Sequence, residues 1–264
     1  MYRQPYALPF DQVSPRRPRR RFVVMLRALV ALLCSSGAWA DEPLRVVTDH
    51  WPPFRMQGAD GKLQGLDIDL LDELQQRTGL RFEVRLLPWA RALEELQDGR
   101  ADLMTGLART AERERHIDYL EPSYHACAPR LYGSPARAAS IRNYAQLNGL
   151  RIGYVLRSAY FEPFDSDTAL IKVGVKNEAQ LLKMQLRGRV ELMIGTDCQV
   201  DYQLRDPALA ARLAKLAFRP QQQTNLYLGL SRVGQHARER QLLVQALEQL
   251  QSDGGLAAIA QRYQ

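Results

Sequence analysis

The sequence has few of the residues that metal sites and cofactor sites require. It contains three cysteines and four histidines among 264 residues, and no two histidines stand four positions apart as in a zinc-binding HExxH motif. It also has no GxSxG, no P-loop and no GxGxxG fingerprint. We therefore expect no metal and no cofactor, and no hydrolase, NTPase or dinucleotide-dependent enzyme of the usual kinds.

The body of the chain has almost no net charge, although the whole sequence carries +7. Residues 1–40 hold seven arginines and one acid, so of 36 basic and 29 acidic residues, 29 and 28 remain in 41–264. A nearly neutral body offers no basic surface for phosphates. Nucleic acid is therefore not an expected partner.

No apolar run approaches the roughly 20 residues of a membrane-spanning helix. The longest candidate, 22–33, has 12 residues and is interrupted by Arg27. It follows the basic RRPRRR and precedes SSGAWA, the order of an export signal, so we expect residues 1–40 to be a signal peptide cleaved after Ala40 and the product to lie in the periplasm. Two points stay open: the start at Met1 or Met25, and the general secretory or twin-arginine route.

Beyond the signal, two cysteines remain. Cys127 and Cys198 are 71 residues apart, without metal-type spacing. In an oxidising compartment they are able to form a disulfide, and two buried free thiols are the alternative.

The periodicity of apolar residues predicts two successive α/β units. In the first, strand patterns at 44–49, 81–88 and 101–106 alternate with helix patterns at 66–79 and 89–99. Residues 117–135 look irregular. From 147 the alternation starts again, with Asn177 as a helix cap, and the chain ends in two helices broken at Gly254-Gly255. We expect parallel sheets with helices on their faces.

Five segments in register give a family resemblance. TDHWPPF, GKLQGLDIDLLDEL, LQDGRADLMTGL, TAERERHIDYLEPSY and LEQLQSDGGLAAIAQRY together resemble the family 3 periplasmic solute-binding proteins, the polar-amino-acid type of ABC-transporter receptor. The resemblance implies an α/β fold of type II with two lobes, two crossing hinge strands and a ligand in the interlobe cleft. It places lobe 1 at 43–128 and 228–264, lobe 2 at 133–223, and the hinge strands near 126–132 and 224–228.

Within GLARTAER, residues 106–113, a strand is predicted to end in a small-residue loop at Gly106 and Ala108 and to enter a helical turn. Exposed N–H groups there favour an anion, and an arginine adds a fork suited to a carboxylate. The resemblance implies that Arg113 holds a ligand carboxylate, assisted by the N–H of Ala108. The alternative is a surface ion pair of Arg113 with Glu121 or Asp118.

Other cleft residues also come from the resemblance. It implies that Trp51 and Trp89 form aromatic walls, with core or hinge positions as the alternative, and that Asp49 orients the first wall or meets a ligand ammonium. In the second lobe it implies a contact from Ser158 and its N–H. Arg157 stands where the family usually has glycine, and its long cation would narrow or recharge the pocket. Family members commonly have a carboxylate for the ammonium after the strand RVELMIG; an ungapped match puts Thr196 there and Asp197 one residue later.

The expected function is that of a monomeric binding protein and not of an enzyme. It would capture a polar amino acid or another small carboxylate, close around it, and present it to an ABC permease or to a sensor's periplasmic domain. A cyclohexadienyl-dehydratase-like enzyme on the same scaffold is the alternative, with Glu162, Asp197 and His125 as candidate acid or base groups. A purely structural exported module is a third hypothesis.

Overall fold

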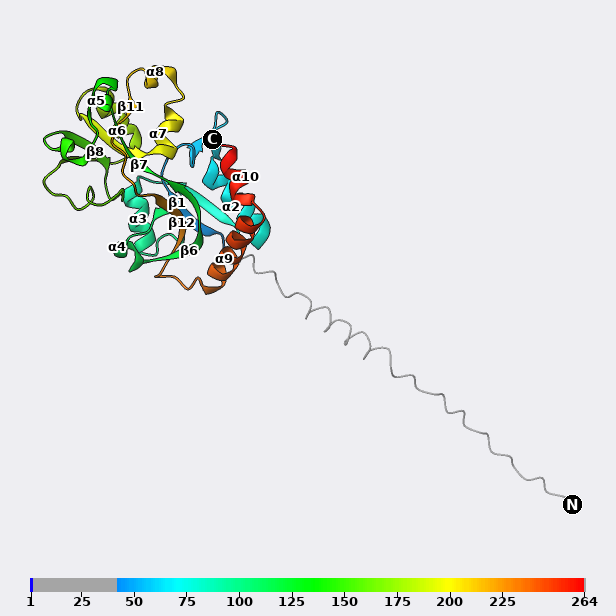
Figure 1. Ribbon diagram of the computed structural model, residues 1–264. Coiled ribbons are helices and arrows are strands. Elements are labelled where there is room, and N and C mark those ends of the chain that lie inside the picture. The colour runs from blue at the N-terminus through cyan, green and yellow to red at the C-terminus, as the bar shows by residue number, and fades with distance from the viewer. Residues whose placement is uncertain (2–41, 264) are drawn as a thin grey trace. The chain divides into compact units, whose positions relative to one another are not determined.

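The computed structural model describes Met1 and residues 42–263. Figure 1 shows the folded body, in which residues 42–263 belong to one compact unit. The predicted signal peptide and its cleavage after Ala40 lie outside the described residues. No helix in the described part of the chain is both long and apolar enough to cross a membrane.

The first sheet has five strands in the order β4-β1-β5-β12-β6. Strand β1 is parallel to both β4 and β5, while β12 runs antiparallel between β5 and β6. The strands are β1 (Leu44–Thr48), β4 (Phe82–Leu86), β5 (Leu103–Ala108), β6 (Ile117–Cys127) and β12 (Thr224–Ser231). A short ribbon pairs β2 (Met56–Gln57) with β3 (Leu63–Gln64).

The second sheet also has five strands, in the order β11-β7-β10-β8-β9. Strands β8, β9 and β10 are parallel, and β7 is antiparallel to its two neighbours. The strands are β7 (Pro129–Gly133), β8 (Arg151–Val155), β9 (Ile171–Val175), β10 (Leu192–Thr196) and β11 (Ala214–Lys215). We call each sheet with its helices a lobe.

The helices pack on these sheets by apolar stripes. In α2 the buried positions Leu66, Leu70, Leu71 and Leu74 recur at helical spacing, and Gly79 ends the helix in a left-handed conformation. In the first lobe the helices are α2 (Leu66–Thr78), α3 (Trp89–Gln97), α4 (Ala111–Glu114), α9 (Ala237–Ser252) and α10 (Gly255–Gln261). In the second they are α5 (Pro135–Ser140), a 3₁₀ turn (Tyr144–Leu147), α6 (Glu178–Leu186), α7 (Asp197–Gln203) and α8 (Pro207–Ala210).

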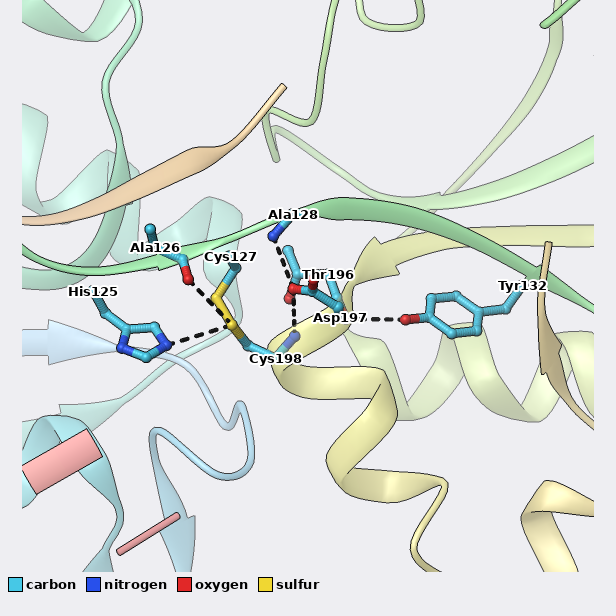
Figure 2. Close-up of a disulfide and its surroundings, with 8 residues drawn as sticks. All are labelled: His125, Ala126, Cys127, Ala128, Tyr132, Thr196, Asp197 and Cys198. Carbon is cyan, nitrogen blue, oxygen red and sulfur yellow. Dashed lines mark hydrogen bonds between the residues drawn. A yellow bond between two sulfur atoms is a disulfide. The ribbon is translucent and has the colours of Figure 1, made fainter. Parts of the chain in front are cut away.

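The chain passes between the lobes twice. It crosses from β6 to β7 through the single residue Ala128 and returns from β11 to β12 over 216–223. A disulfide between Cys127 and Cys198 joins the end of β6 to the first turn of α7, beside the first crossing (Figure 2). Of the two alternatives for these cysteines, the structure has the disulfide.

The sequence interpretation was wrong for residues 117–135. They are not irregular, because β6 is an eleven-residue strand and β7 follows it. Pro122 lies inside β6 and has no N–H to donate, and the ladder to β12 shifts register between Leu226 and Leu228, opposite this stretch. A proline and a register shift hide the period of two that identifies a strand.

Candidate functional site

A cavity of about 60 Å³ lies between the lobes. The lobes are in contact beside it, because the carbonyl of Arg157 in the second lobe accepts hydrogen bonds from Arg113 and Trp89 in the first lobe. One apolar cluster accordingly contains residues from both lobes, among them Trp89 and Val155. The cavity is lined by Asp49, Trp51, Arg55, Trp89, Gly106, Ala108, Arg113, Val155, Ser158, Ala159, Tyr160, Glu178, Thr196, Thr224 and Leu226.

Arg55 is a fully paired cation at the end of β1. The loop after β1 turns back so that Trp51 and Arg55 exchange backbone hydrogen bonds of 2.9 and 3.0 Å. The guanidinium, 1% exposed, donates to Asp49 Oδ1 at 2.5 Å and to Asp67 Oδ2 at 2.6 Å. Burial opposes its charge, but Asp67 and Asp49 outweigh burial and raise the pKa of Arg55.

Gly106 leaves space for the guanidinium of Arg55. Its φ of +74° is in the left-handed region, and a Cβ at this position would lie 2.5 Å from Nη1 of Arg55. Only glycine meets both conditions without strain. The small residue that the sequence pattern singled out therefore admits the Arg55 guanidinium to the cavity wall.

Arg113 is the second buried cation and has no acidic partner within 4.0 Å among the described residues. It lies in the single turn α4, where Thr110 Oγ1 accepts its backbone N–H, and it is 4% exposed. Its guanidinium donates to the carbonyls of Ala108 at 2.8 Å and Arg157 at 2.7 Å. Burial lowers the pKa of Arg113. A desolvated guanidinium with only neutral acceptors gains most from an added carboxylate.

The surface ion pairs that were the alternative for Arg113 are made by other arginines. Arg109 pairs with Glu121 at 2.6 Å, and Asp118 pairs with Arg240 at 2.8 Å. Among residues 42–263, none of the ion pairs within 4.0 Å includes Arg113. The sequence analysis predicted that the N–H of Ala108 faces a ligand; in the structure the carbonyl of Ala108 accepts a hydrogen bond from Arg113.

A loop after β8 closes the cleft over Arg113 and Trp89. The carbonyl of Arg157 accepts both Nη2 of Arg113 and, at 3.2 Å, Nε1 of Trp89. Its side chain reaches Gln97 Oε1 at 2.9 Å, a second contact with the first lobe. Arg157 has a φ of +62°, a conformation that glycine adopts far more readily. That explains physically why glycine is usual here in the family that the sequence resembles.

The two predicted aromatic walls both line the cavity. Trp89, the first residue of α3, is 7% exposed, and the Arg113 guanidinium carbon lies 5.6 Å from its ring centroid. Trp51 stacks on Phe54 at 4.4 Å, and the Arg55 guanidinium carbon lies 5.0 Å from its ring. Each ring thus packs on one of the two buried cations.

Two polar side chains of the second lobe line the cavity with atoms that lack partners. Glu178, the first residue of α6, is 9% exposed, and its Oε2 has no hydrogen-bond partner in the part of the chain that the structure describes. Oγ1 of Thr196, at the end of β10, is also buried without a hydrogen-bond partner among the described residues. Burial, and next the Asp49 carboxylate, raise the pKa of Glu178 to about 8.

Asp197 does not line this cavity. Its Oδ1 accepts the N–H groups of Ala128 and Cys198, each at 2.8 Å, so it fastens α7 to the crossing strand (Figure 2). As the first residue of α7 it turns toward the disulfide, whereas Thr196 before it faces the cleft. The ungapped match put Thr196 where the family usually has a carboxylate and Asp197 one residue later. In the structure Thr196 lines the cavity and Asp197 does not.

The three candidate acid and base groups do not share one cavity. His125 and Asp197 line a cavity beside the disulfide, and Glu162 lines another, on the side of Tyr227. His125, Cys127 and Cys198 have the arrangement of a metal site, with ligand atoms within 4.8 Å of one another. The two sulfur atoms are bonded to each other, so neither is a free thiolate for a metal.

Seven of the nine residues predicted for the site line the cavity, and Arg157 contributes its carbonyl at the rim. The sequence analysis missed Arg55, Glu178 and the cleft-facing role of Thr196. Arg55 directly follows the quoted TDHWPPF segment, and Glu178 directly follows the predicted cap Asn177. No local signal indicates that either side chain points into a cleft.

Two five-stranded sheets, two crossings and a cavity between the lobes define a two-lobed solute-binding protein. Residues 44–264 match the bacterial extracellular solute-binding proteins, family 3, and the chain belongs to this family. The predicted family and fold are confirmed.

Individual relatives agree with this assignment. The chain is 25% identical over 252 residues to the "Probable amino-acid-binding protein YxeM" of Bacillus subtilis (strain 168), covering 91% of this chain and 93% of that one. A histidine kinase sensor domain with similarity to periplasmic binding proteins superposes with a TM-score of 0.75 at 18% identity, over 85% and 96% of the two chains. An ancestral arginine-binding protein bound to arginine gives 0.73 at 20%, over 85% and 99%.

Proposed function

We propose that this protein captures a small carboxylate-bearing solute, a polar amino acid or an analogue, in the periplasm and delivers it by hinge closure to a membrane partner. The observation that carries the proposal is Arg113, a buried guanidinium in the interlobe cavity that has no acidic partner among the described residues. The description of YxeM as amino-acid-binding supports the ligand class.

Closure follows from the contacts of Arg113 across the cleft. Its guanidinium donates to the Ala108 carbonyl of the first lobe and to the Arg157 carbonyl of the second. Each of these carbonyl oxygens carries only a partial negative charge. When the lobes separate, a ligand carboxylate would take the place of the Arg157 carbonyl and offer a full charge to the same donors. The ligand then bridges both lobes and shifts the hinge equilibrium toward the closed form.

The ligand class is tested by thermal denaturation of the exported protein with a panel of polar amino acids and small dicarboxylates. A ligand at 100 times its dissociation constant should add about 2.7 kcal/mol, a rise in Tm of about 5–10 °C for a protein of this size. Arg113→Met should abolish the rise, because it keeps the volume but removes the charge. Arg115→Ala, an exposed arginine two residues away, is the matched control.

Two results would contradict the proposal. One is that no compound in the panel raises the Tm of the wild-type protein. The other is that Arg113→Met binds the same carboxylate ligand with unchanged affinity. In either case the carboxylate site would lie elsewhere or not exist.

For the membrane partner, an ABC permease is the first choice, and the fold shared with a histidine kinase sensor domain supports a sensor as the second. Deleting the gene separates them. Loss of uptake of the radiolabelled ligand indicates a permease, whereas unchanged uptake with loss of the transcriptional response to the ligand indicates a sensor. If neither changes, the proposed delivery is wrong.

A further inference from the structure

The interlobe cavity has a polar corner that the carboxylate-binding arginine does not explain. Glu178 and Thr196 both line it from the second lobe, and each buries an oxygen without a partner in residues 42–263. Glu178 is more than nine-tenths buried. Buried polar atoms are normally paired, so two orphans in one ligand cavity point to a group that the ligand brings.

The charges around the cavity indicate the sign of that group. The two arginines, Arg55 and Arg113, face three carboxylates, those of Asp49, Asp67 and Glu178, of which two already hold Arg55. With Glu178 protonated, as its raised pKa of about 8 indicates, the two arginines balance Asp49 and Asp67. A ligand carboxylate on Arg113 then leaves one negative charge, which a cationic nitrogen of the same ligand would balance.

We infer that Glu178, with the Thr196 hydroxyl as a second acceptor, receives a cationic nitrogen of the ligand. This rests on the proposed function, because Arg113 then holds the carboxylate of the same molecule. The ligand is therefore an amino acid, and a simple mono- or dicarboxylate is excluded. The acid comes from the start of α6, whereas the place after β10, where the resemblance implies it, is held by Thr196.

Binding then depends on pH. Without ligand Glu178 has a pKa of about 8 and is mostly protonated at neutral pH. A ligand cation favours the ionised form, so binding releases a proton. Around the shared cavity the groups that face Glu178 are Asp49, Arg55, Arg113 and Tyr160. On its other side a second cavity of about 530 Å³ presents His50, Lys183, Arg187 and Arg212, none of which pairs with Glu178 within the described chain.

The test is isothermal titration calorimetry of the wild-type protein and Glu178→Gln with L-arginine, L-glutamine and succinate between pH 6 and 8. For the wild-type protein the affinity for an amino acid should rise by up to about tenfold per pH unit, with release of up to one proton. Glu178→Gln should bind at least about tenfold more weakly at pH 8 and show no pH slope. Glu83→Gln, an exposed glutamate on β4, is the matched control.

The three probes separate the sources of the cation. Equal slopes for L-arginine and L-glutamine assign the α-ammonium to Glu178, and a slope for L-arginine alone assigns its side chain; both results support the inference. The pH dependence of the wild-type affinity is measured without the variant, so it tests the inference even if Glu178→Gln does not fold. Binding of succinate alone, affinity that falls as pH rises, or an amino acid bound equally well by Glu178→Gln would overturn the inference and leave the carboxylate site standing. No binding by any probe would overturn both.

Discussion

Two arginines are buried in the same cleft to almost the same extent. We expect removal of Arg55 to destabilise the fold and removal of Arg113 to leave its stability almost unchanged. Arg55 is 1% exposed and Arg113 is 4% exposed. Arg55 neutralises the carboxylates of Asp49 and Asp67, whereas Arg113 donates to the carbonyls of Ala108 and Arg157 and forms no ion pair with a described acid. Replacing each by methionine keeps the volume and removes the charge, so the comparison isolates what each charge does for the fold.

Arg55→Met leaves two buried carboxylates without their partner. Breaking a buried pair from one side costs about 3–5 kcal/mol, and here two acids are left at once. For Arg113→Met neither acceptor loses all its donors, because Tyr119 donates its hydroxyl to the Ala108 carbonyl at 3.0 Å and Trp89 still donates to the Arg157 carbonyl. The cost of burying the guanidinium also disappears. We expect a change in the free energy of unfolding within about 1 kcal/mol.

The measurement is thermal denaturation of the protein without added ligand, followed by tryptophan fluorescence and by circular dichroism. Arg55→Met should lower Tm by about 10 °C, and Arg113→Met should keep Tm within about 3 °C while abolishing ligand-induced stabilisation. Asp67→Asn in the Arg55→Met background should recover part of the lost stability, because it removes one of the two unpaired buried carboxylates. An equal loss from both methionine variants would refute the argument, because Arg113 would then be supporting the fold.

Three further predictions follow from the same contacts. Replacing Cys127 and Cys198 by alanine opens a loop of 71 residues and should cost about 4 kcal/mol in unfolding free energy, seen as a lower urea midpoint that reductant no longer changes. Gly106→Ala places a methyl group against Arg55 and should cost about 2 kcal/mol or more, and an unchanged Tm would contradict the packing. The pKa of Glu178 is raised in the fold from 4.5 to about 8, so its contribution is fully present below pH 4.5 and is lost as pH rises through 8. The loss should be on the order of 4 kcal/mol in denaturation curves and absent in Glu178→Gln.

The layered fold was predictable because its signals are local. The leucine stripe of α2, the cap Asn177 and the break at Gly254 each act within one turn of helix, and the structure has all three. Among the strands that were missed, β6 is one whose period of two is interrupted by Pro122 and a register shift. Where residues close together in the sequence set the conformation, the sequence was sufficient to predict the helix or its end.

The composition of the cleft was less predictable because it depends on pairing at a distance. Arg55 and its partner Asp67 are twelve residues apart, and only the turn of the chain after β1 brings them together. The partnerless state of Arg113 depends on Glu121 and Asp118 being taken by Arg109 and Arg240. A sequence shows which charges exist but not which of them have partners.

The position of Glu178 has a simple origin in the second sheet. Strands β8, β9 and β10 are parallel, so the loops after them meet at one edge of the sheet. At this edge lie Arg157 in the loop after β8, Glu178 at the start of α6 after β9, and Thr196 as the last residue of β10. A carboxylate at the start of α6 therefore faces the same cavity as a side chain at the end of β10, and an acid can stand at either place without a change of fold. Such a change of place alters the distance and direction from the carboxylate fork to the acid, and we expect it to change which amino acid fits while the hinge and both lobes stay the same.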